Sequence, residues 1–161
     1  WVGVVVVVVV YLVLSGGASV SVVEVDALMD LYESTEGFQW VQNDGWGSQE
    51  SACVWYGVLC SAANNTVVGL ELENNGLQGK LRDSLGSLAN VTVLRLGQNS
   101  ISNTDLDMLS GLVSLEVLDM GGNLIRSGIP ISFALLNRLQ MLDMSNNFLT
   151  GPLHESTAAA W

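Results

Sequence analysis

The sequence predicts an α/β-type solenoid in which short parallel strands stack into one sheet, and two observations lead to this fold class. Asparagine recurs every 24 residues, at Asn75, Asn99, Asn123 and Asn147. Apolar residues recur at fixed offsets from each asparagine, which gives the repeat L-x-x-L-x-L-x-x-N-x-L. One unit cannot bury its apolar side chains alone, so we expect the units to stack on one another.

The first segment, residues 1–19, is predicted to be a signal peptide. An apolar run from Val2 to Leu14 is followed by the small residues Gly16 and Ala18, which suit a signal peptidase. A signal anchor and a buried strand of β-branched residues are the alternatives. Because the chain begins with Trp1 and ends without a recognisable terminator, we interpret it as a fragment of a longer protein.

Residues 20–66 are predicted to form a cap that covers the first turn of the solenoid. The spacing Ser21-x-x-Glu24 is that of a capping box. A helix should follow and end near Gly37, with an apolar stripe formed by Val25, Leu28, Met29 and Tyr32. We expect Trp40, Trp46 and Trp55 to plug the exposed end of the core, the alternative being a ligand-stacking surface.

Four repeats follow at 67–90, 91–114, 115–138 and 139–161, the last one truncated. In each, the alternating apolar positions predict a short strand with one buried face. The asparagine should bond inward-pointing backbone groups where the strand bends into a loop. We therefore expect a structural ladder of Asn75, Asn99, Asn123 and Asn147, with Asn103 lying off this ladder.

Composition excludes several functions. The formal net charge of -11, with five basic residues against sixteen acidic ones, opposes binding to nucleic acid or to an anionic membrane surface. Because His154 is the sole histidine, we predict no metal site, no catalytic triad and no cofactor. The pairs Asp105 with Asp107 and Asp119 with Asp143 are interpreted as solvated acidic residues rather than catalytic carboxylates.

The repeat resembles the plant-type class of the leucine-rich repeat family, whose L-x-G-x-I-P element is similar to segments 77–81, 128–130 and 149–153. The second unit departs from it at Asn103-Thr104-Asp105-Leu106, which leaves the strand or turn there in doubt. Segment 53–60 matches the C-x-W-x-G-V-x-C signature of the family's N-terminal cap. The resemblance implies a Cys53–Cys60 disulfide and a right-handed superhelix with its sheet on the concave face. It also implies short helical, 3-10 or extended segments on the convex face.

The residues between the buried leucines should point outward from the sheet and form the ligand-binding surface. Arg95 could bond a carboxylate on a ligand. Two N-glycosylation sequons, at Asn64 and Asn90, are candidate modification sites because the predicted signal peptide would direct the chain to the secretory pathway. The ligand-binding candidates are Glu71, Glu73, Val93, Arg95, Val117, Asp119, Met141 and Asp143.

These features predict a non-catalytic, secreted or cell-surface recognition module that binds a protein, peptide or glycan. One alternative is the ectodomain of a membrane receptor-like kinase whose catalytic domain lies outside this chain. In that case contact with the membrane would come only through a signal anchor or a downstream span. A structural wall or matrix protein is a third possibility.

Overall fold

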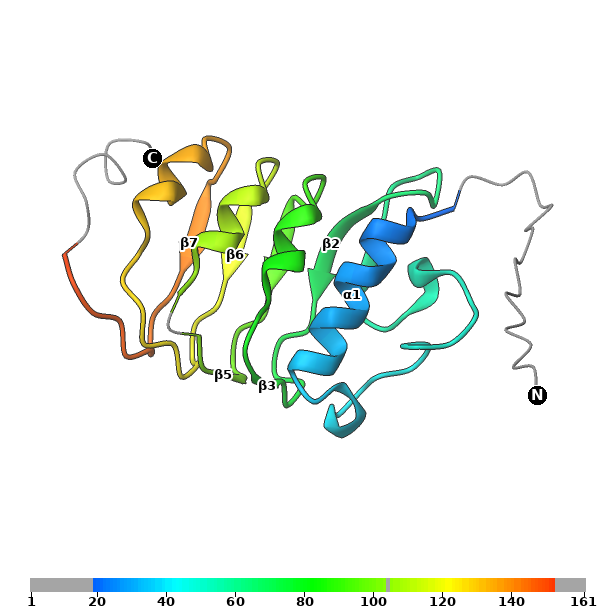
Figure 1. The fold of residues 1–161 in the computed structure, drawn as a ribbon, viewed down its shortest axis with the longest axis horizontal. Helices are drawn as coiled ribbons and strands as arrows, with labels where there is room; N and C mark the ends of the chain where they lie inside the picture. Colours follow the sequence, from blue (N-terminus) through cyan, green and yellow to red (C-terminus); the bar gives the residue numbers. More distant parts are fainter. Residues whose placement is uncertain (1–18, 104, 153–161) are drawn as a thin grey trace, which may run out of the picture.

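The computed structural model describes residues 19–103 and 105–152, which form a solenoid behind an N-terminal helix (Figure 1). Residues 1–18 of the predicted signal segment and His154 lie outside the described residues. Helix α1 spans Val22–Ser34. The strands are β1 (Val58–Cys60), β2 (Val67–Glu71), β3 (Gln78–Gly79), β4 (Val93–Arg95), β5 (Ser100–Ile101), β6 (Val117–Asp119) and β7 (Met141–Asp143). The 3-10 helices are η1 (Gly37–Gln39), η2 (Ala52–Val54), η3 (Asp83–Ser87), η4 (Asp107–Gly111) and η5 (Ile131–Leu135).

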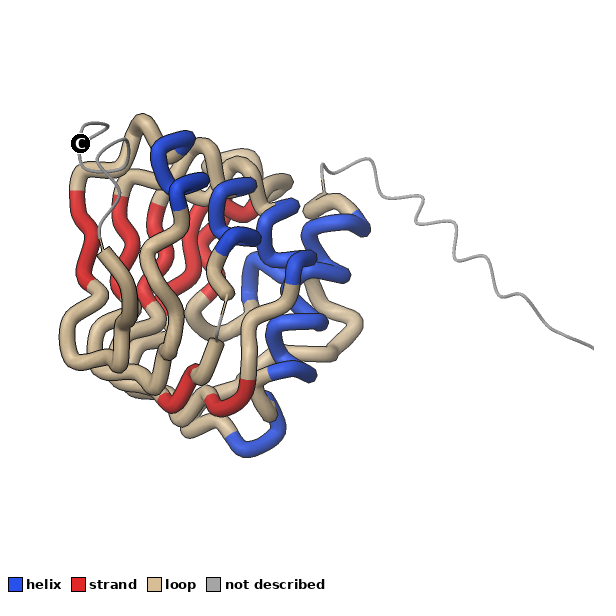
Figure 2. Tube along the Cα trace, turned by 60° about the vertical axis from the view of Figure 1, so that its left-hand side comes forward, coloured by secondary structure: helices blue, strands red, loops and turns tan. Residues whose placement is uncertain are grey.

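The main sheet has the order β1-β2-β4-β6-β7, and its last four strands are parallel. Their register follows the 24-residue period: Leu70 pairs with Leu94, Leu94 with Leu118, and Leu118 with Leu142. The structure therefore confirms the predicted solenoid. The helices η3, η4 and η5 lie on the other side of the molecule from the sheet (Figure 2).

The start of α1 is fixed by a capping box that also reaches the sheet. The Ser21 side chain accepts from the Glu24 backbone, and Glu24 Oε2 accepts from the Ser21 N–H at 3.1 Å. Glu24 is itself buried, and its other oxygen accepts from the N–H of Val67 at 3.0 Å. One carboxylate thus joins the helix start to the start of β2.

Two details of α1 differ from the sequence expectation. The buried face centres on Ala27, Leu28 and Leu31, whereas the expected stripe residues Val25, Met29 and Tyr32 are only partly buried. The helix also ends before Gly37, and the left-handed residue is Glu36, with φ 58°. Gly37 has a packing role instead, because a Cβ there would lie 2.0 Å from the ring of Tyr32.

The three tryptophans of the cap are buried in one aromatic cluster. Trp46 lies between Trp40 and Trp55, with ring centroids 5.0 and 5.1 Å away, and Tyr32 stacks on it at 5.8 Å. The cluster adjoins the leucine core of the first repeat. The tryptophans therefore occupy the plugging position rather than forming a stacking surface.

The second repeat keeps its short strand despite its unusual sequence, since β5 pairs in parallel with β3. Asn103 lies off the ladder of the four periodic asparagines, as expected, yet its side chain makes hydrogen bonds of the same kind. It is 4% exposed, its Oδ1 accepts from Leu81 N–H at 2.7 Å, and its Nδ2 donates to Leu81 O at 3.0 Å. A buried amide here supplies partners for backbone groups of the preceding unit.

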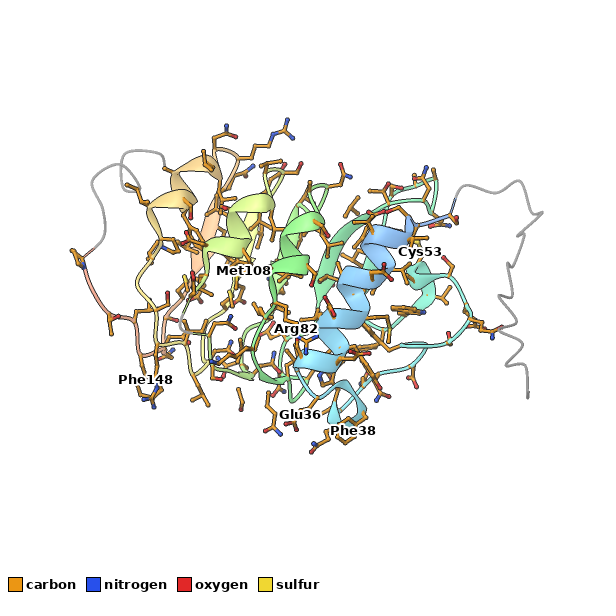
Figure 3. All side chains as sticks on the ribbon, in the orientation of Figure 1. Glu36, Phe38, Cys53, Arg82, Met108 and Phe148 are labelled. Carbon is orange, nitrogen blue, oxygen red and sulfur yellow. A yellow bond between two sulfur atoms is a disulfide. The ribbon has the colours of Figure 1, made fainter. Side chains whose placement is uncertain are left out.

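Close contacts between backbones hold the convex side together. A Cβ on Gly111 of η4 would lie 2.4 Å from the carbonyl oxygen of Gly86 in η3. Arg82, just before η3, forms an ion pair with Asp30 of α1 at 3.2 Å, and Figure 3 shows it beside that helix. Glycine thus sets the spacing between η3 and η4, and the segment before η3 is joined to the cap.

Candidate functional site

The candidate site is the face of the five-stranded sheet turned away from η3, η4 and η5, which we call the concave face (Figure 2). Buried leucines fill its inner side, so alternate residues point outward. Because the parallel strands are in register, equivalent residues of successive repeats form straight rows across the face. Two of these rows contain seven of the eight predicted ligand-binding candidates.

The first row is apolar and extends across all five strands. Val93 and Val117 are half-buried neighbours, followed by Met141, which is 43% exposed. At the cap end the row contains Gly69, which pairs with Leu59 of the antiparallel strand β1. A Cβ on Gly69 would lie 3.0 Å from the Leu59 side chain, so Leu59 covers the glycine and completes the row.

Leu59 is a surface residue that the repeat pattern did not identify. It lies in the cap, outside the 24-residue period, and its strand runs against the others. Val58, Leu59 and Cys60 are all apolar, so the sequence does not show that Val58 is buried and Leu59 exposed in β1, nor which strand lies beside β1.

The second row carries charge, in the order Glu71, Arg95, Asp119, Asp143. The Arg95 Nε lies 3.6 Å from Oε1 of Glu71, and both side chains are partly exposed. Asp119 and Asp143 are direct register neighbours with like charge. Within the described residues, neither aspartate has an ion-pair partner.

Each aspartate of this row is held by the loop that follows its own strand. Asp119 Oδ1 accepts from the Gly121 N–H at 3.0 Å, and Asp143 Oδ1 accepts from the Ser145 N–H at 2.8 Å. The hydrogen bonds from Ser145 lower the pKa of Asp143 from its ordinary value. The end of the row therefore stays negatively charged at neutral pH.

Two further rows follow the charged row, and in both the backbone conformation or close packing limits which residues fit. Glu73 is exposed, but its equivalents Gly97 and Gly121 lie beneath the carboxylates of Asp119 and Asp143. A Cβ on Gly97 would come within 2.7 Å of Asp119 Oδ1. In the next row every residue has a positive φ, a conformation that favours the one glycine and the two asparagines found there. Its members are Asn74, Gln98, Gly122 and Asn146.

The four periodic asparagines lie under this end of the strands. Asn99 Oδ1 accepts from the N–H groups of Asn75 and Leu77 at 3.0 Å, and its Nδ2 donates to Leu72 O at 2.9 Å. Asn123 and Asn147 repeat the bonds to Leu77 and Leu72 one and two units later, accepting from the N–H groups of Ile101 and Ile125 and donating to Leu96 O and Met120 O. Asn75 instead binds the backbone of Gln42 at 2.7 and 2.9 Å, so the ladder continues into the cap.

The cap contains the disulfide and the first sequon. Cys53 and Cys60 are bonded to each other, with their Cα atoms 5.5 Å apart. Asn64, in the loop between β1 and β2, and Asn90, before β4, are both exposed. Neither asparagine lies on the concave face.

Within residues 19–103 and 105–152, no group of three or more His, Cys, Asp or Glu residues is placed to hold a metal ion. Over the same residues, no helix combines the length and the apolar character that crossing a bilayer requires. Asp105 and Asp107 are exposed. Asp107 accepts from Ser132 on the neighbouring turn, and Asp105 accepts from the Asp107 backbone.

Comparison with known proteins identifies the repeat. The family model described as "Leucine rich repeat" matches residues 66–125 and 89–149, which together cover more than half of the chain. The chain belongs to the leucine-rich repeat family. Its relatives place it with the plant-type members.

One such relative is phytosulfokine receptor 1 of Arabidopsis thaliana, 45% identical over 60 residues that represent 34% of this chain and 6% of the receptor. Among solved structures, the PEPR1–AtPEP1 complex is similar with a TM-score of 0.72 and 27% identity, covering 82% of this chain and 19% of that one.

A second similar structure is the Arabidopsis receptor kinase HAESA in complex with the peptide hormone IDA and the co-receptor SERK1. It has a TM-score of 0.62 and 29% identity, and it covers 79% of this chain and 21% of HAESA. This leucine-rich repeat chain thus spans less than a quarter of the length of each of these three proteins.

Proposed function

We propose that the chain is a non-catalytic recognition module, exposed outside the cell, that binds a peptide or protein segment on its concave face. The observation that carries the proposal is the row of Leu59, Val93, Val117 and Met141 beside a row of charged residues. Apolar area next to charge suits a ligand that buries some side chains and is oriented by others. The similarity to HAESA bound to a peptide hormone supports a peptide as the ligand.

We further propose that the module is part of a receptor-like kinase ectodomain, since two of its relatives are named as receptors or receptor kinases. In that case the reading frame downstream should encode a membrane span and a kinase domain. Sequencing the full transcript tests this. Further repeats followed by a stop codon would instead indicate a secreted binder.

A phage library of random dodecapeptides tests the binding proposal. We expect the wild-type protein to select binding peptides from the library. The affinity of these peptides for Val117→Arg should be lower by at least about tenfold, because the ligand would have to desolvate a charged side chain in the apolar row. The matched control is Ile131→Arg, at a position that is 56% exposed on η5. Recovery of no peptides, or equal loss in both variants, would contradict binding at the concave face.

We also propose that Asn64 and Asn90 carry N-linked glycans, because both are exposed and lie off the binding face. Glycans at these positions would leave the ligand surface open. Enzymatic deglycosylation of protein secreted from a eukaryotic cell should lower its mass, and Asn64→Gln and Asn90→Gln should each remove part of that difference. An unchanged mass would exclude modification at both positions.

A further inference from the structure

Arg95 is a cation whose hydrogen-bonding capacity is largely unused. A guanidinium has five N–H donors arranged to bind carboxylates in a fork. In the described part of the chain, the guanidinium of Arg95 donates no hydrogen bond, and its nearest ion-pair partner is Glu71, with an Nε to Oε1 distance of 3.6 Å. A contact that long and that exposed leaves the donor groups of Arg95 available to a ligand.

Asp119 is the residue that could have paired with Arg95 but does not. The two are register partners on adjacent strands. Asp119 instead lies over Gly97 and accepts from the Gly121 N–H. Because Gly97 has no side chain, the carboxylate can lie over the glycine in this way, and among the described residues Arg95 forms an ion pair only with Glu71 of β2 and none on the β6 side.

Whereas Arg95 is a cation with unused donor groups, Asp119 and Asp143 are two anions that lack a basic partner among the described residues. Like charges directly opposite each other on neighbouring strands repel, and no described cation forms an ion pair with either. A basic group placed between them would relieve that repulsion. The row therefore offers a donor site at Arg95 and, next to it, an acceptor site at the two aspartates.

The register sets the distance between these two sites. Adjacent strands lie about 4.8 Å apart, so Asp119 and Asp143 are about 5 and 10 Å from Arg95 along the row. An extended peptide advances about 3.3 Å per residue. An acidic and a basic group one to three positions apart in a peptide that crosses the strands would match the spacing.

We propose that the ligand is an extended peptide that crosses the strands with a carboxylate bonded to Arg95 and a basic side chain between Asp119 and Asp143. The acidic group then lies toward the cap and the basic group toward β7. Apolar side chains of the same peptide rest on Val93 and Val117. This inference rests on the proposed function and adds the charge pattern of the ligand.

The same dodecapeptide library tests the pattern by sequencing the recovered pools. Wild-type protein should enrich peptides with an acidic and a basic residue within three positions of each other. Arg95→Gln should lose the acidic preference and keep the basic one. Asp119→Asn combined with Asp143→Asn should do the reverse, since asparagine can still accept from Gly121 and Ser145.

Two control variants make the same types of substitution elsewhere, one at an arginine and one at an aspartate. Arg138→Gln changes an exposed arginine in the loop before β7, and Asp83→Asn changes an exposed aspartate on η3. Both should recover the wild-type pool. A selected peptide, synthesised and measured by calorimetry, should bind about tenfold more weakly to Arg95→Gln and should bind more weakly as salt rises. Thermal melts of all variants establish that they fold.

The outcomes separate this inference from the proposed function. If Val117→Arg abolishes capture but the peptides show no paired charges, or only basic residues, the charge pattern is wrong while the concave face remains the binding site. If Arg138→Gln alters the pool as much as Arg95→Gln does, the role of Arg95 is also wrong. If Val117→Arg has no effect on capture, both proposals fail.

Discussion

At the scale of single residues, the fold depends on asparagine amides that supply partners for backbone groups in the preceding unit. Asn99 bonds two N–H groups and one carbonyl of the first repeat. Asn103 bonds both backbone groups of Leu81. The two residues lie in different loops, yet their hydrogen-bonding roles are similar.

We predict that Asn99→Ala and Asn103→Ala each lower the free energy of unfolding by about 1–3 kcal/mol, because both leave buried backbone groups without partners. The measurement is urea unfolding followed by circular dichroism. Ser100→Ala is the control, since Ser100 is exposed in β5, and it should change the free energy of unfolding little. An Asn103→Ala midpoint equal to that of the control would show that this second amide is not structural.

At the scale of elements, the cap and the convex turns each depend on one local constraint. The disulfide joins η2 to β1, and the Gly86–Gly111 contact sets the separation of η3 and η4. The Gly86–Gly111 contact lies on the convex side, so changes there should alter stability before they alter recognition. Cys60 directly follows Leu59 in β1, so the disulfide lies closer to the binding face.

Replacing Cys53 and Cys60 together by serine should destabilise the cap by about 2–3 kcal/mol, the loop-closure estimate for so short a ring. Because neighbouring units interact only with each other, amide exchange should accelerate in β1 and α1 more than in β6.

In the unaltered protein, both cysteines should resist alkylation until a reductant is added. Rapid alkylation of the native protein would argue against the bond.

Gly111→Ala should lower the free energy of unfolding by about 1–3 kcal/mol, because the new methyl group would overlap the Gly86 carbonyl and force the two turns apart. Thermal unfolding measures this. Val113→Ala, just beyond η4 and 51% exposed, is the comparison. Similar melting temperatures for the two variants would mean that the turns can separate at little cost.

The periodic part of the chain could be predicted from sequence, and the rest could not. The 24-residue recurrence identifies the strands, the buried leucines and the asparagine ladder, since each repeat reports the same position again. Leu59, Glu36 and Asn103 depend on contacts made once, between segments that do not repeat. A pattern shows which residues share a row, but it does not show which backbone groups a particular loop leaves unpaired.

At the scale of the whole molecule, stability should accumulate through contacts between neighbouring units. In the last unit, Leu142 is only partly buried although its equivalent Leu118 is fully buried, and Leu149 is 38% exposed where Ile125 is fully buried. Strand β7 ends the five-stranded sheet. Within the described residues no strand pairs with the outer edge of β7, and an unpaired edge favours association with other chains.

Adding a capping repeat after Trp161 should therefore raise the melting temperature and reduce self-association, since it would bury Leu142 and Leu149 and pair the edge of β7. Calorimetry and sedimentation velocity measure the two effects. As a control, the same unit with its inward leucines replaced by serine should give neither benefit. If the capped and uncapped proteins are equally stable monomers, the exposed face of the last unit has no energetic importance.

The central claim is that recognition takes place on the concave face, and methyl NMR of the protein titrated with a selected dodecapeptide tests it most directly. The account predicts chemical-shift changes at Leu59, Val93, Val117 and Met141, with Val113, Ile131 and Leu135 unchanged. Changes confined to Val113, Ile131 and Leu135 would contradict it and would place the ligand on the convex side.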